Sequence, residues 1–211
     1  MARLGIEHDA ALGEAKAGTR RRSIALRLDG EPWLRVEPEV FADLDVRDGD
    51  DLDATRRTDV ERALARARAR LFVVRSLAVR MQSRAEILEK LEARDVPAEI
   101  AEEAIARVIG YGYLDDAALA GQLARGMRSR GYGRRRAAQK LRARRLVGPL
   151  AEEALDAAYA EEDEIGLARE ALGRRPVADD AARRRAIAFL ARRGFPSGVA
   201  WAAVRRARDE G

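Results

Sequence analysis

A helical pattern that returns about every 50 residues constrains the fold of this 211-residue chain more than any other feature. The stretch KLEARDVPAEIAEEAI (residues 90–105) matches KLRARRLVGPLAEEAL (140–155), and a weaker third copy is FLARRGFPSGVAWAAV (189–204). Repeats of this length are typical of arrays in which each unit buries its apolar face partly against its neighbours. We therefore predict an elongated, curved tandem array of three three-helix repeats, at residues 58–114, 115–160 and 161–211.

Apolar residues recur with helical spacing from residue 58 onward, which predicts that this part of the chain is α-helical. The first helix would bury one face, made of Val60, Leu64, Ala67, Leu71, Val74, Ala78 and Met81. Ser83 and Glu86 have the spacing of a capping box, in which each side chain satisfies a backbone amide at a helix start. A second helix is expected to follow, with Ile87, Leu88 and Leu91 buried.

The N-terminal quarter has a different pattern. Residues 24–36 alternate between apolar and polar around Asp29-Gly30, a dipeptide that supplies the positive φ angles of a tight hairpin turn. We predict a small α+β segment over residues 23–57, built on this hairpin, and a disordered N-terminus over residues 1–22. The expected fold class is mainly all-α, preceded by this small β-hairpin segment.

Charge is distributed unevenly, although the net charge is only +5. Residues 1–60, 61–160 and 161–211 carry net charges of −4, +7 and +2. The hydrophobic content of 47% is sufficient for folded cores. A basic middle third favours an anionic partner, most often a nucleic acid.

The basic side chains are densest over residues 125–145, which hold ten of them and no carboxylate. A helix is predicted over residues 134–145, with Ala137, Ala138 and Leu141 buried and the bases around that seam. No acid occurs between Asp116 and Glu152, so we expect none of these bases to have a carboxylate partner on its own or the adjacent helix. The candidate contact residues are Arg125, Arg128, Arg130, Arg134, Arg135, Arg136, Lys140, Arg142 and Arg144.

A solvated helix face is the simpler interpretation of these bases, but such faces usually intersperse both signs of charge. The aromatic residues add little to a nucleic-acid site. Tyr111, Tyr113 and Tyr132 follow or precede glycines in predicted turns, where tyrosines usually pack over helix ends. Trp33 and Trp201 are likewise expected to serve core or inter-repeat packing.

Catalysis is not expected from this sequence. There is no cysteine, and the single histidine, His8, lies in the N-terminal stretch. We predict no metal site, no cofactor and no phosphate-binding loop, because the glycines of GYGYLDD have the wrong spacing. Asp115 and Asp116 are interpreted as a helix N-cap and a first-turn acid. No segment has the pattern of a signal peptide or membrane span, so a cytoplasmic protein is expected.

The central third resembles the RecX regulatory proteins of bacteria. Its matching motifs are GYLDD (Gly112–Asp116), RGYG (Arg130–Gly133), an arginine-rich helix (Arg134–Leu146) and EEAL (Glu152–Leu155). The resemblance implies a non-catalytic regulator that binds the RecA recombinase, chiefly as a filament on DNA. We expect the protein to be a monomer. It implies inhibition of the filament's ATPase, strand-exchange and co-protease activities, and thus a role in DNA repair, recombination and the SOS response.

The same resemblance gives the basic residues a role as contacts to acidic filament surface or to the phosphates of single- or double-stranded DNA. Two rival functions remain open at this stage. One is a helical-repeat protein that binds DNA directly and without sequence preference, through phosphate contacts. The other is a scaffold for a different acidic protein.

Overall fold

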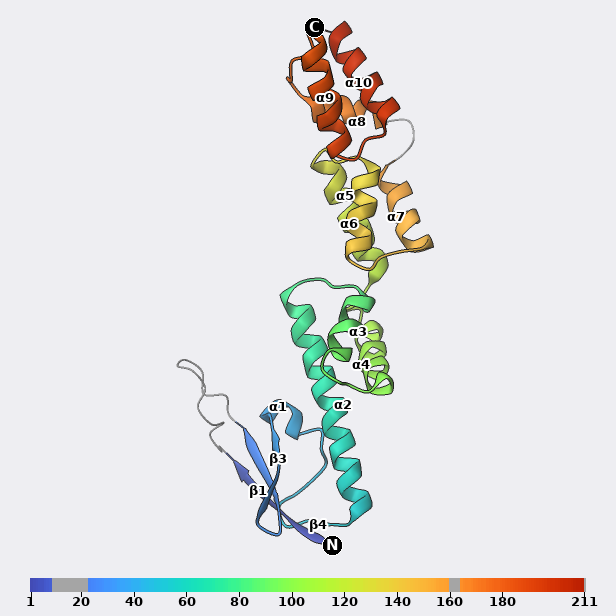
Figure 1. The fold of residues 1–211 in the computed structure, drawn as a ribbon. Helices are drawn as coiled ribbons and strands as arrows, with labels where there is room; N and C mark the ends of the chain where they lie inside the picture. The colour runs from blue at the N-terminus through green and yellow to red at the C-terminus, as the bar shows by residue number, and fades with distance from the viewer. Residues whose placement is uncertain (9–22, 160–163, 211) are drawn as a thin grey trace, which may run out of the picture. The chain divides into compact units, whose positions relative to one another are not determined.

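The computed structural model describes residues 1–8, 23–159 and 164–210 (Figure 1). These residues form two compact units. Unit 1 comprises Met1–Arg80 and Ile87–Tyr113, and unit 2 comprises Met81–Glu86 and Leu114–Gly211. The expected fold class, a mainly helical chain with a small N-terminal sheet, is confirmed. The predicted elongation and curvature of the array stay predictions.

Unit 1 begins with a four-stranded antiparallel sheet in the order β3-β2-β1-β4. The strands are β1 (Ala2–His8), β2 (Ile24–Leu28), β3 (Glu31–Val36) and β4 (Asp51–Leu52). The predicted hairpin is confirmed as β2 and β3. Its turn residues Asp29 and Gly30 have φ angles of 51° and 85°, as a tight turn between twisted strands requires.

Strand β1 contradicts the disorder predicted for residues 1–22, at least over residues 2–8; residues 9–22 lie outside the described part of the chain. The strand is held from both sides, because it pairs with β2 along Leu4–His8 and with β4 at Ala2 and Arg3. Leu4 is 2% exposed in the sheet core. The distant partner strands and this burial outweigh a locally weak sequence signal.

Helices α1 (Pro38–Phe41) and α2 (Ala54–Val79) follow the sheet. Helix α2 begins four residues earlier than the predicted repeat, because the Asp53 carboxylate accepts a hydrogen bond from the Arg56 amide at 2.7 Å and caps it.

Helix α2 buries two different faces along its length. Leu64 and Ala67, which were predicted to be buried, pack into the core of the sheet. Towards its C-terminal end, Val73 is fully buried where α2 packs on α4 (Ala98–Gly110), whereas Val74 is 48% exposed. The predicted single face is therefore wrong beyond the middle of α2, since the helix changes packing partner.

The predicted capping box is confirmed at the start of α3 (Arg84–Glu92). The Ser83 amide donates to Glu86 Oε2 at 2.9 Å, and the Glu86 amide donates to Ser83 Oγ at 3.1 Å. Ile87 and Leu91 are fully buried as expected. The division between the units falls within α3. Its residues up to Glu86 belong to unit 2, and those from Ile87 onward belong to unit 1.

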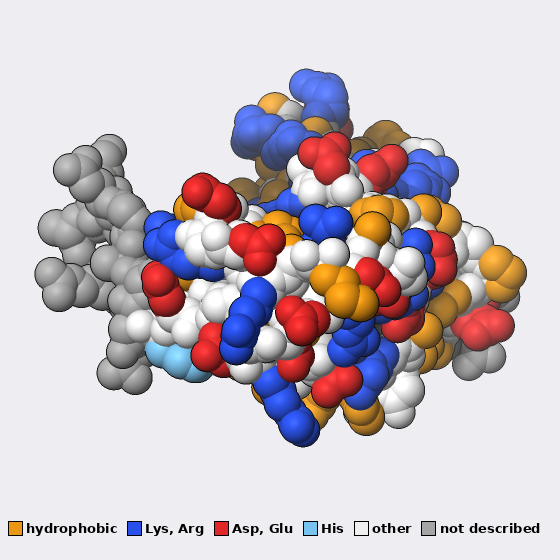
Figure 2. All heavy atoms as spheres, turned by 90° about the horizontal axis from the view of Figure 1, so that it is seen from below, with side chains coloured by type: hydrophobic (Ala, Val, Ile, Leu, Met, Phe, Trp, Pro, Cys, Tyr) orange, Lys and Arg blue, Asp and Glu red, His pale blue; other side chains and the backbone are white. Residues whose placement is uncertain are grey.

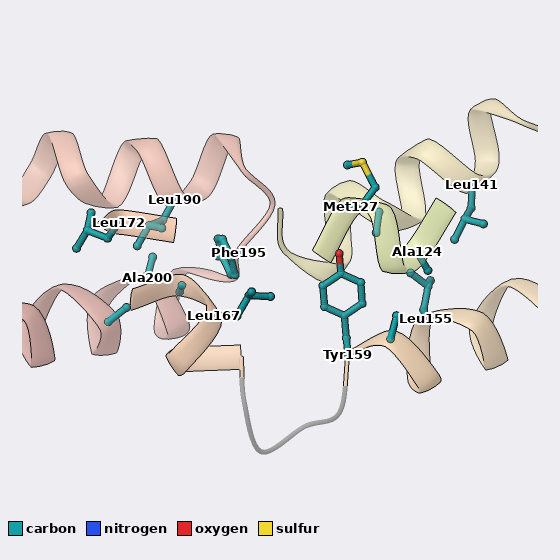
Figure 3. Close-up of a cluster of buried hydrophobic side chains, with 14 of the residues drawn as sticks. Ala124, Met127, Leu141, Leu155, Tyr159, Leu167, Leu172, Leu190, Phe195 and Ala200 are labelled. Atoms are coloured by element: carbon teal, nitrogen blue, oxygen red, sulfur yellow. The ribbon is translucent and has the colours of Figure 1, made fainter. Parts of the chain in front are cut away.

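The remaining six helices lie in unit 2 and share one hydrophobic core, part of which Figure 3 shows. They are α5 (Asp116–Ser129), α6 (Arg134–Ala143), α7 (Pro149–Ala158), α8 (Glu164–Leu172), α9 (Asp180–Arg192) and α10 (Ser197–Asp209). Side chains from both groups of three helices, such as Leu155 and Leu190, belong to this core.

Each of the three repeats ends its middle helix in the same way. A residue in the left-handed region follows the helix, and the next amide donates back to the carbonyl of a fully buried leucine, as in a Schellman motif. The left-handed residues are Asp95 (φ 56°), Arg145 (φ 59°) and Gly194 (φ 91°). The hydrogen-bonded pairs are Val96–Leu91 (3.2 Å), Leu146–Leu141 (3.0 Å) and Phe195–Leu190 (3.1 Å). The repeats found in the sequence are thus repeats of backbone geometry.

Candidate basic contact surface

All nine predicted contact residues lie in unit 2, on α5, α6 and the residues that cap these helices. Helix α6 is shorter than the predicted 134–145, because Arg144 is its C-cap and Arg145 adopts a left-handed conformation. Ala137 and Leu141 are fully buried, as predicted. The nine residues therefore surround a short helix, and their environments differ.

Arg144 is a structural residue and not an exposed contact. Its Nε donates to Glu86 Oε1 at 2.8 Å, and its Nη2 donates to the Met81 carbonyl at 2.7 Å and to Glu86 Oε2 at 3.0 Å. The Arg144 and Glu86 side chains are only 16% and 13% exposed. This charge is therefore neutralised within unit 2.

Arg134 also contradicts the expectation that no base has a nearby carboxylate partner. It pairs with Asp156 at 2.6 Å and with Glu152 at 2.8 Å, both on α7. Burial alone would lower the pKa of Arg134, but the two carboxylates act against it and the net result is a raised pKa. The prediction was wrong because it considered only the absence of acids between Asp116 and Glu152. Helix α7 packs beside α6 and places Glu152 and Asp156 next to Arg134.

Four bases on α6 keep the predicted character. Arg135, Arg136, Lys140 and Arg142 are exposed, and none forms an ion pair with another described residue. Arg136 donates to the side-chain oxygen of Gln139 at 3.1 Å. We call these four residues the α6 basic face. Within the described part of the chain, these four positive charges have no ion-pair partner.

Unit 1 offers a contrast to this face. In the view of Figure 2, acidic and basic side chains are interspersed over the near surface. Arginines of α2 pair with acids brought in from other elements, as in Arg70–Asp43 at 2.7 Å and Arg66–Glu103 at 2.9 Å. Several surface arginines of unit 1 are thus paired with acids. A high arginine content alone therefore does not explain the unpaired bases of the α6 basic face.

Six of the nine predicted contact residues line two cavities of unit 2. The first, of about 670 Å³, is lined by Arg125, Arg128, Ser129, Arg130, Gly131, Leu167, Glu170, Ala171 and Arg193. The second, of about 480 Å³, is lined by Arg134, Arg135, Ala138, Gln139, Arg142, Glu152, Leu155, Glu164 and Pro196. Arg193 was not among the predicted contact residues, although it caps the end of α9 as Arg144 caps the end of α6.

Burial raises the pKa of two groups in unit 2, and nearby arginines oppose both shifts. Burial raises the pKa of Glu164 in the second cavity, and the charges of Arg134 and Arg135 oppose this shift. The Tyr159 hydroxyl donates to the Tyr132 carbonyl at 2.9 Å. Burial raises the pKa of Tyr159 to about 12, against the opposing charge of Arg128. The arginines thus influence groups that are themselves part of the packed structure.

The aromatic predictions are confirmed in part. Tyr132 is half-buried beneath the Arg193 guanidinium, which lies 5.0 Å from its ring centre, and Trp33 packs against the sheet core. Tyr111 and Tyr113, however, are 61% and 68% exposed, with ring centres 6.1 Å apart. Their predicted packing over helix ends is wrong, because the GYGY turn directs both rings outwards. Trp201, predicted to pack, is 58% exposed on α10.

Among the described residues, no three histidine or acidic side chains come together in a group that could hold a metal ion. None of the described helices is sufficiently long and apolar to cross a membrane.

Fold and surface together define a tandem helical-repeat protein with a basic face on its middle repeat. Two family models match the chain: the first three-helix domain of RecX over residues 69–107, and the second over residues 115–155. A RecX regulatory protein of Thermus thermophilus is 41% identical over 140 residues, which cover 66% of this chain and 92% of that protein. That of Deinococcus radiodurans is 38% identical over 141 residues, or 65% and 67% of the two chains.

Solved structures agree on the fold. A crystal structure of the regulatory protein RecX aligns over 100% of both chains, with a TM-score of 0.65 and 20% identity. The structure of RecX from Lactobacillus salivarius aligns over 70% of this chain and 98% of that one, with a TM-score of 0.59 and 20% identity. The chain belongs to the RecX family of regulatory proteins.

Proposed function

We propose that this protein is a non-catalytic regulator that binds the RecA–DNA filament and inhibits its ATPase, strand-exchange and co-protease activities. Family membership supports the regulatory role, since the relatives are named regulatory proteins. The observation that supports a contact surface is the α6 basic face, because its four charges lack ion-pair partners among the described residues. Acting on a DNA-bound filament would place this role in the cytoplasm.

The α6 basic face suits a repeating anionic partner. Each exposed pair of unlike charges contributes little by itself, about 0–1 kcal/mol. A filament presents the same acidic surface at every protomer, so several weak contacts made by one chain would act together. We infer that the basic face and the first cavity engage neighbouring positions of the filament and restrain its conformational cycle.

The direct test is ATP hydrolysis by RecA on single-stranded DNA, measured while this protein is added in substoichiometric amounts. A parallel titration measures its binding to the same DNA without RecA. We expect inhibition at ratios too low to cover the DNA. Inhibition that appears only when the DNA is saturated would contradict action on the filament.

Direct DNA binding is the second candidate function. The specific observation in its favour is that Arg125, Arg128 and Arg130 converge on one open cavity of about 670 Å³. Phosphate contacts release condensed counterions, so affinity for DNA alone would fall steeply as salt is raised. A shallow salt dependence with DNA, together with retained inhibition of RecA, would exclude this function as the principal one.

A further inference from the structure

The second and third repeats are joined by a contact between a turn and a helix end. The turn Arg130–Gly133, which links the first two helices of repeat 2, is here called a corner. Gly133 donates its amide to the Arg193 carbonyl at 2.9 Å, and Arg193 Nη1 donates to the carbonyls of Arg130 (2.9 Å) and Gly131 (3.1 Å). A Cβ atom on Gly131 would lie 3.2 Å from that of Ala171. Ala171, Arg193, Gly194 and Phe195 thus form a slot that holds the corner.

The middle repeat uses the equivalent arginine in the same way. Arg144 lies 49 positions before Arg193 and likewise caps the middle helix of its repeat. Its Nη2 donates to the carbonyl of Met81 at 2.7 Å, within unit 2. Met81 precedes the second helix of repeat 1 as Gly131 precedes that of repeat 2. Two of the three repeats therefore hold the preceding corner through this arginine.

In the first repeat, the equivalent residues line an open cavity. Phe72, Arg94, Asp95 and Val96 stand 99 positions before Ala171, Arg193, Gly194 and Phe195. They border a cavity of about 430 Å³ in unit 1, together with Glu37, Leu91, Pro97 and residues of α2. No corner of the described chain precedes this repeat. The Arg94 guanidinium instead lies 4.0 Å from the Phe72 ring centre. We call this cavity the repeat-1 slot.

At the other end of the array, the corner of repeat 3 is exposed. The link from α8 to α9 comprises residues 173–179. Its first four residues, Gly173 to Pro176, are exposed and are here called the repeat-3 corner, whereas Val177 packs against the core of unit 2. Gly173 has a φ of 59°, the same left-handed conformation as Gly131 at 71°. The described chain therefore contains one open slot and one exposed corner.

We propose that the repeat-1 slot of one copy receives the repeat-3 corner of a second copy, so that chains associate head to tail. We infer that the slot binds a corner because repeats 2 and 3 each bind the preceding corner through the arginine at this position. The slot and the repeat-3 corner also carry side chains of opposite charge. Asp95 stands where Arg145 and Gly194 stand in the other repeats, and its carboxylate would lie opposite the exposed Arg174 of the incoming corner. The neighbouring Arg175 is held by its own chain, 3.7 Å from the Phe189 ring centre and hydrogen-bonded to the Leu172 carbonyl at 3.1 Å.

A head-to-tail contact of this kind is heterologous and does not close on itself. It is also smaller than the intramolecular contacts, because the Phe72 ring occupies space that Ala171 leaves open for Gly131. The contact alone therefore leaves the protein monomeric in dilute solution. It joins copies when concentration is high or when a polymer aligns them side by side.

Site-directed cross-linking tests this arrangement without RecA, so its outcome is separate from that of the proposed function. The chain has no cysteine, which permits two single-cysteine proteins of distinguishable size. One carries Pro97→Cys in the slot and the other carries Pro176→Cys in the corner, which leaves Arg174 in place. They are mixed over a range of concentrations and treated with a short bismaleimide. The control replaces Pro97→Cys with Arg62→Cys, on an exposed position of α2 outside the slot.

We expect a heterodimer whose yield rises with concentration and clearly exceeds that of the Arg62→Cys control. Adding Arg94→Ala to the slot protein removes the arginine donor without adding a negative charge, and it should lower the yield about tenfold, equivalent to about 1.4 kcal/mol. Arg107→Ala, an exposed change on α4, should leave the yield unchanged, and circular dichroism checks that both variants are folded. Equal yields from Pro97→Cys and Arg62→Cys, or a yield insensitive to Arg94→Ala, would overturn the proposal.

Discussion

Arg144 and Glu86, which are 58 residues apart in the sequence, form a two-pronged ion pair of 2.8 and 3.0 Å that is largely removed from solvent. Glu86 also accepts the Ser83 amide at 2.9 Å. One carboxylate therefore caps a helix and neutralises an arginine at the end of another. The pair makes the start of α3 part of unit 2.

Replacing Arg144 with alanine should destabilise unit 2 by about 3 kcal/mol. The loss leaves the Glu86 carboxylate buried without its counter-charge and the Met81 carbonyl without its donor. Urea-induced unfolding followed by circular dichroism measures the change. Arg142→Ala removes an exposed arginine two positions earlier and should stay within about 0.5 kcal/mol of the parent. Equal effects of the two variants would contradict the structural role of Arg144.

Gly133→Ala should destabilise the protein by about 2 kcal/mol, because overpacking displaces surrounding atoms. A Cβ atom at this position would lie 2.7 Å from the Gly194 carbonyl oxygen and 2.9 Å from the Phe195 amide nitrogen, both backbone atoms. Gly126, inside α5, has no such neighbour within 4 Å. Gly126→Ala should therefore stabilise the helix by about 0.5–1 kcal/mol. Thermal melts of the two variants should shift in opposite directions.

The raised pKa of Tyr159 predicts that the free energy of unfolding falls at alkaline pH. Burial raises its pKa from 10 to about 12, so between these values the folded protein keeps a proton that the unfolded chain releases. The stability that the neutral Tyr159 hydroxyl contributes is fully present below pH 10, and it is lost as the pH rises from 10 to about 12. Tyr159→Phe lacks the titrating hydroxyl. The stability advantage of the parent over this variant should therefore shrink from pH 9.5 to 11.5.

Chemical denaturation at several pH values measures that difference, and Tyr111→Phe provides the control. Tyr111 is 61% exposed and outside the cores, so its replacement by phenylalanine should leave the stability of the parent unchanged. A constant difference between parent and Tyr159→Phe across the window would show that Tyr159 does not retain its proton on folding.

Local patterns predicted the fold well. The hairpin turn at Asp29-Gly30 and the capping box of Ser83 and Glu86 depend on neighbouring residues, so the sequence contains the full signal. The repeat offset placed Leu91, Leu141 and Leu190 at equivalent positions, and all three are fully buried. Strand β1 was missed because its stability comes from β2 and β4, which lie far away in the sequence.

The candidate surface was predicted less well, because charge neutralisation is not local. Arg134 meets Asp156 across the helix pair, and Arg144 meets Glu86 from the preceding repeat. Neither pairing follows from sequence spacing alone. The exposed bases of the α6 basic face were identifiable because buried Ala137 and Leu141 fix the orientation of the helix.

The most direct test of the account compares two triple variants for inhibition of RecA ATP hydrolysis on single-stranded DNA. One is Arg135→Ala, Arg136→Ala and Lys140→Ala on the α6 basic face. The other removes three exposed arginines elsewhere, through Arg62→Ala, Arg107→Ala and Arg205→Ala. The two carry the same net charge, so a difference between them reports the position of the charges.

We predict that the α6 triple variant requires at least about tenfold more protein for half-maximal inhibition, a loss of about 1.4 kcal/mol in binding. The matched variant should inhibit like the parent, and both should melt at temperatures close to that of the parent. Equal inhibition by the two triple variants would contradict the claim that the α6 basic face is the contact surface.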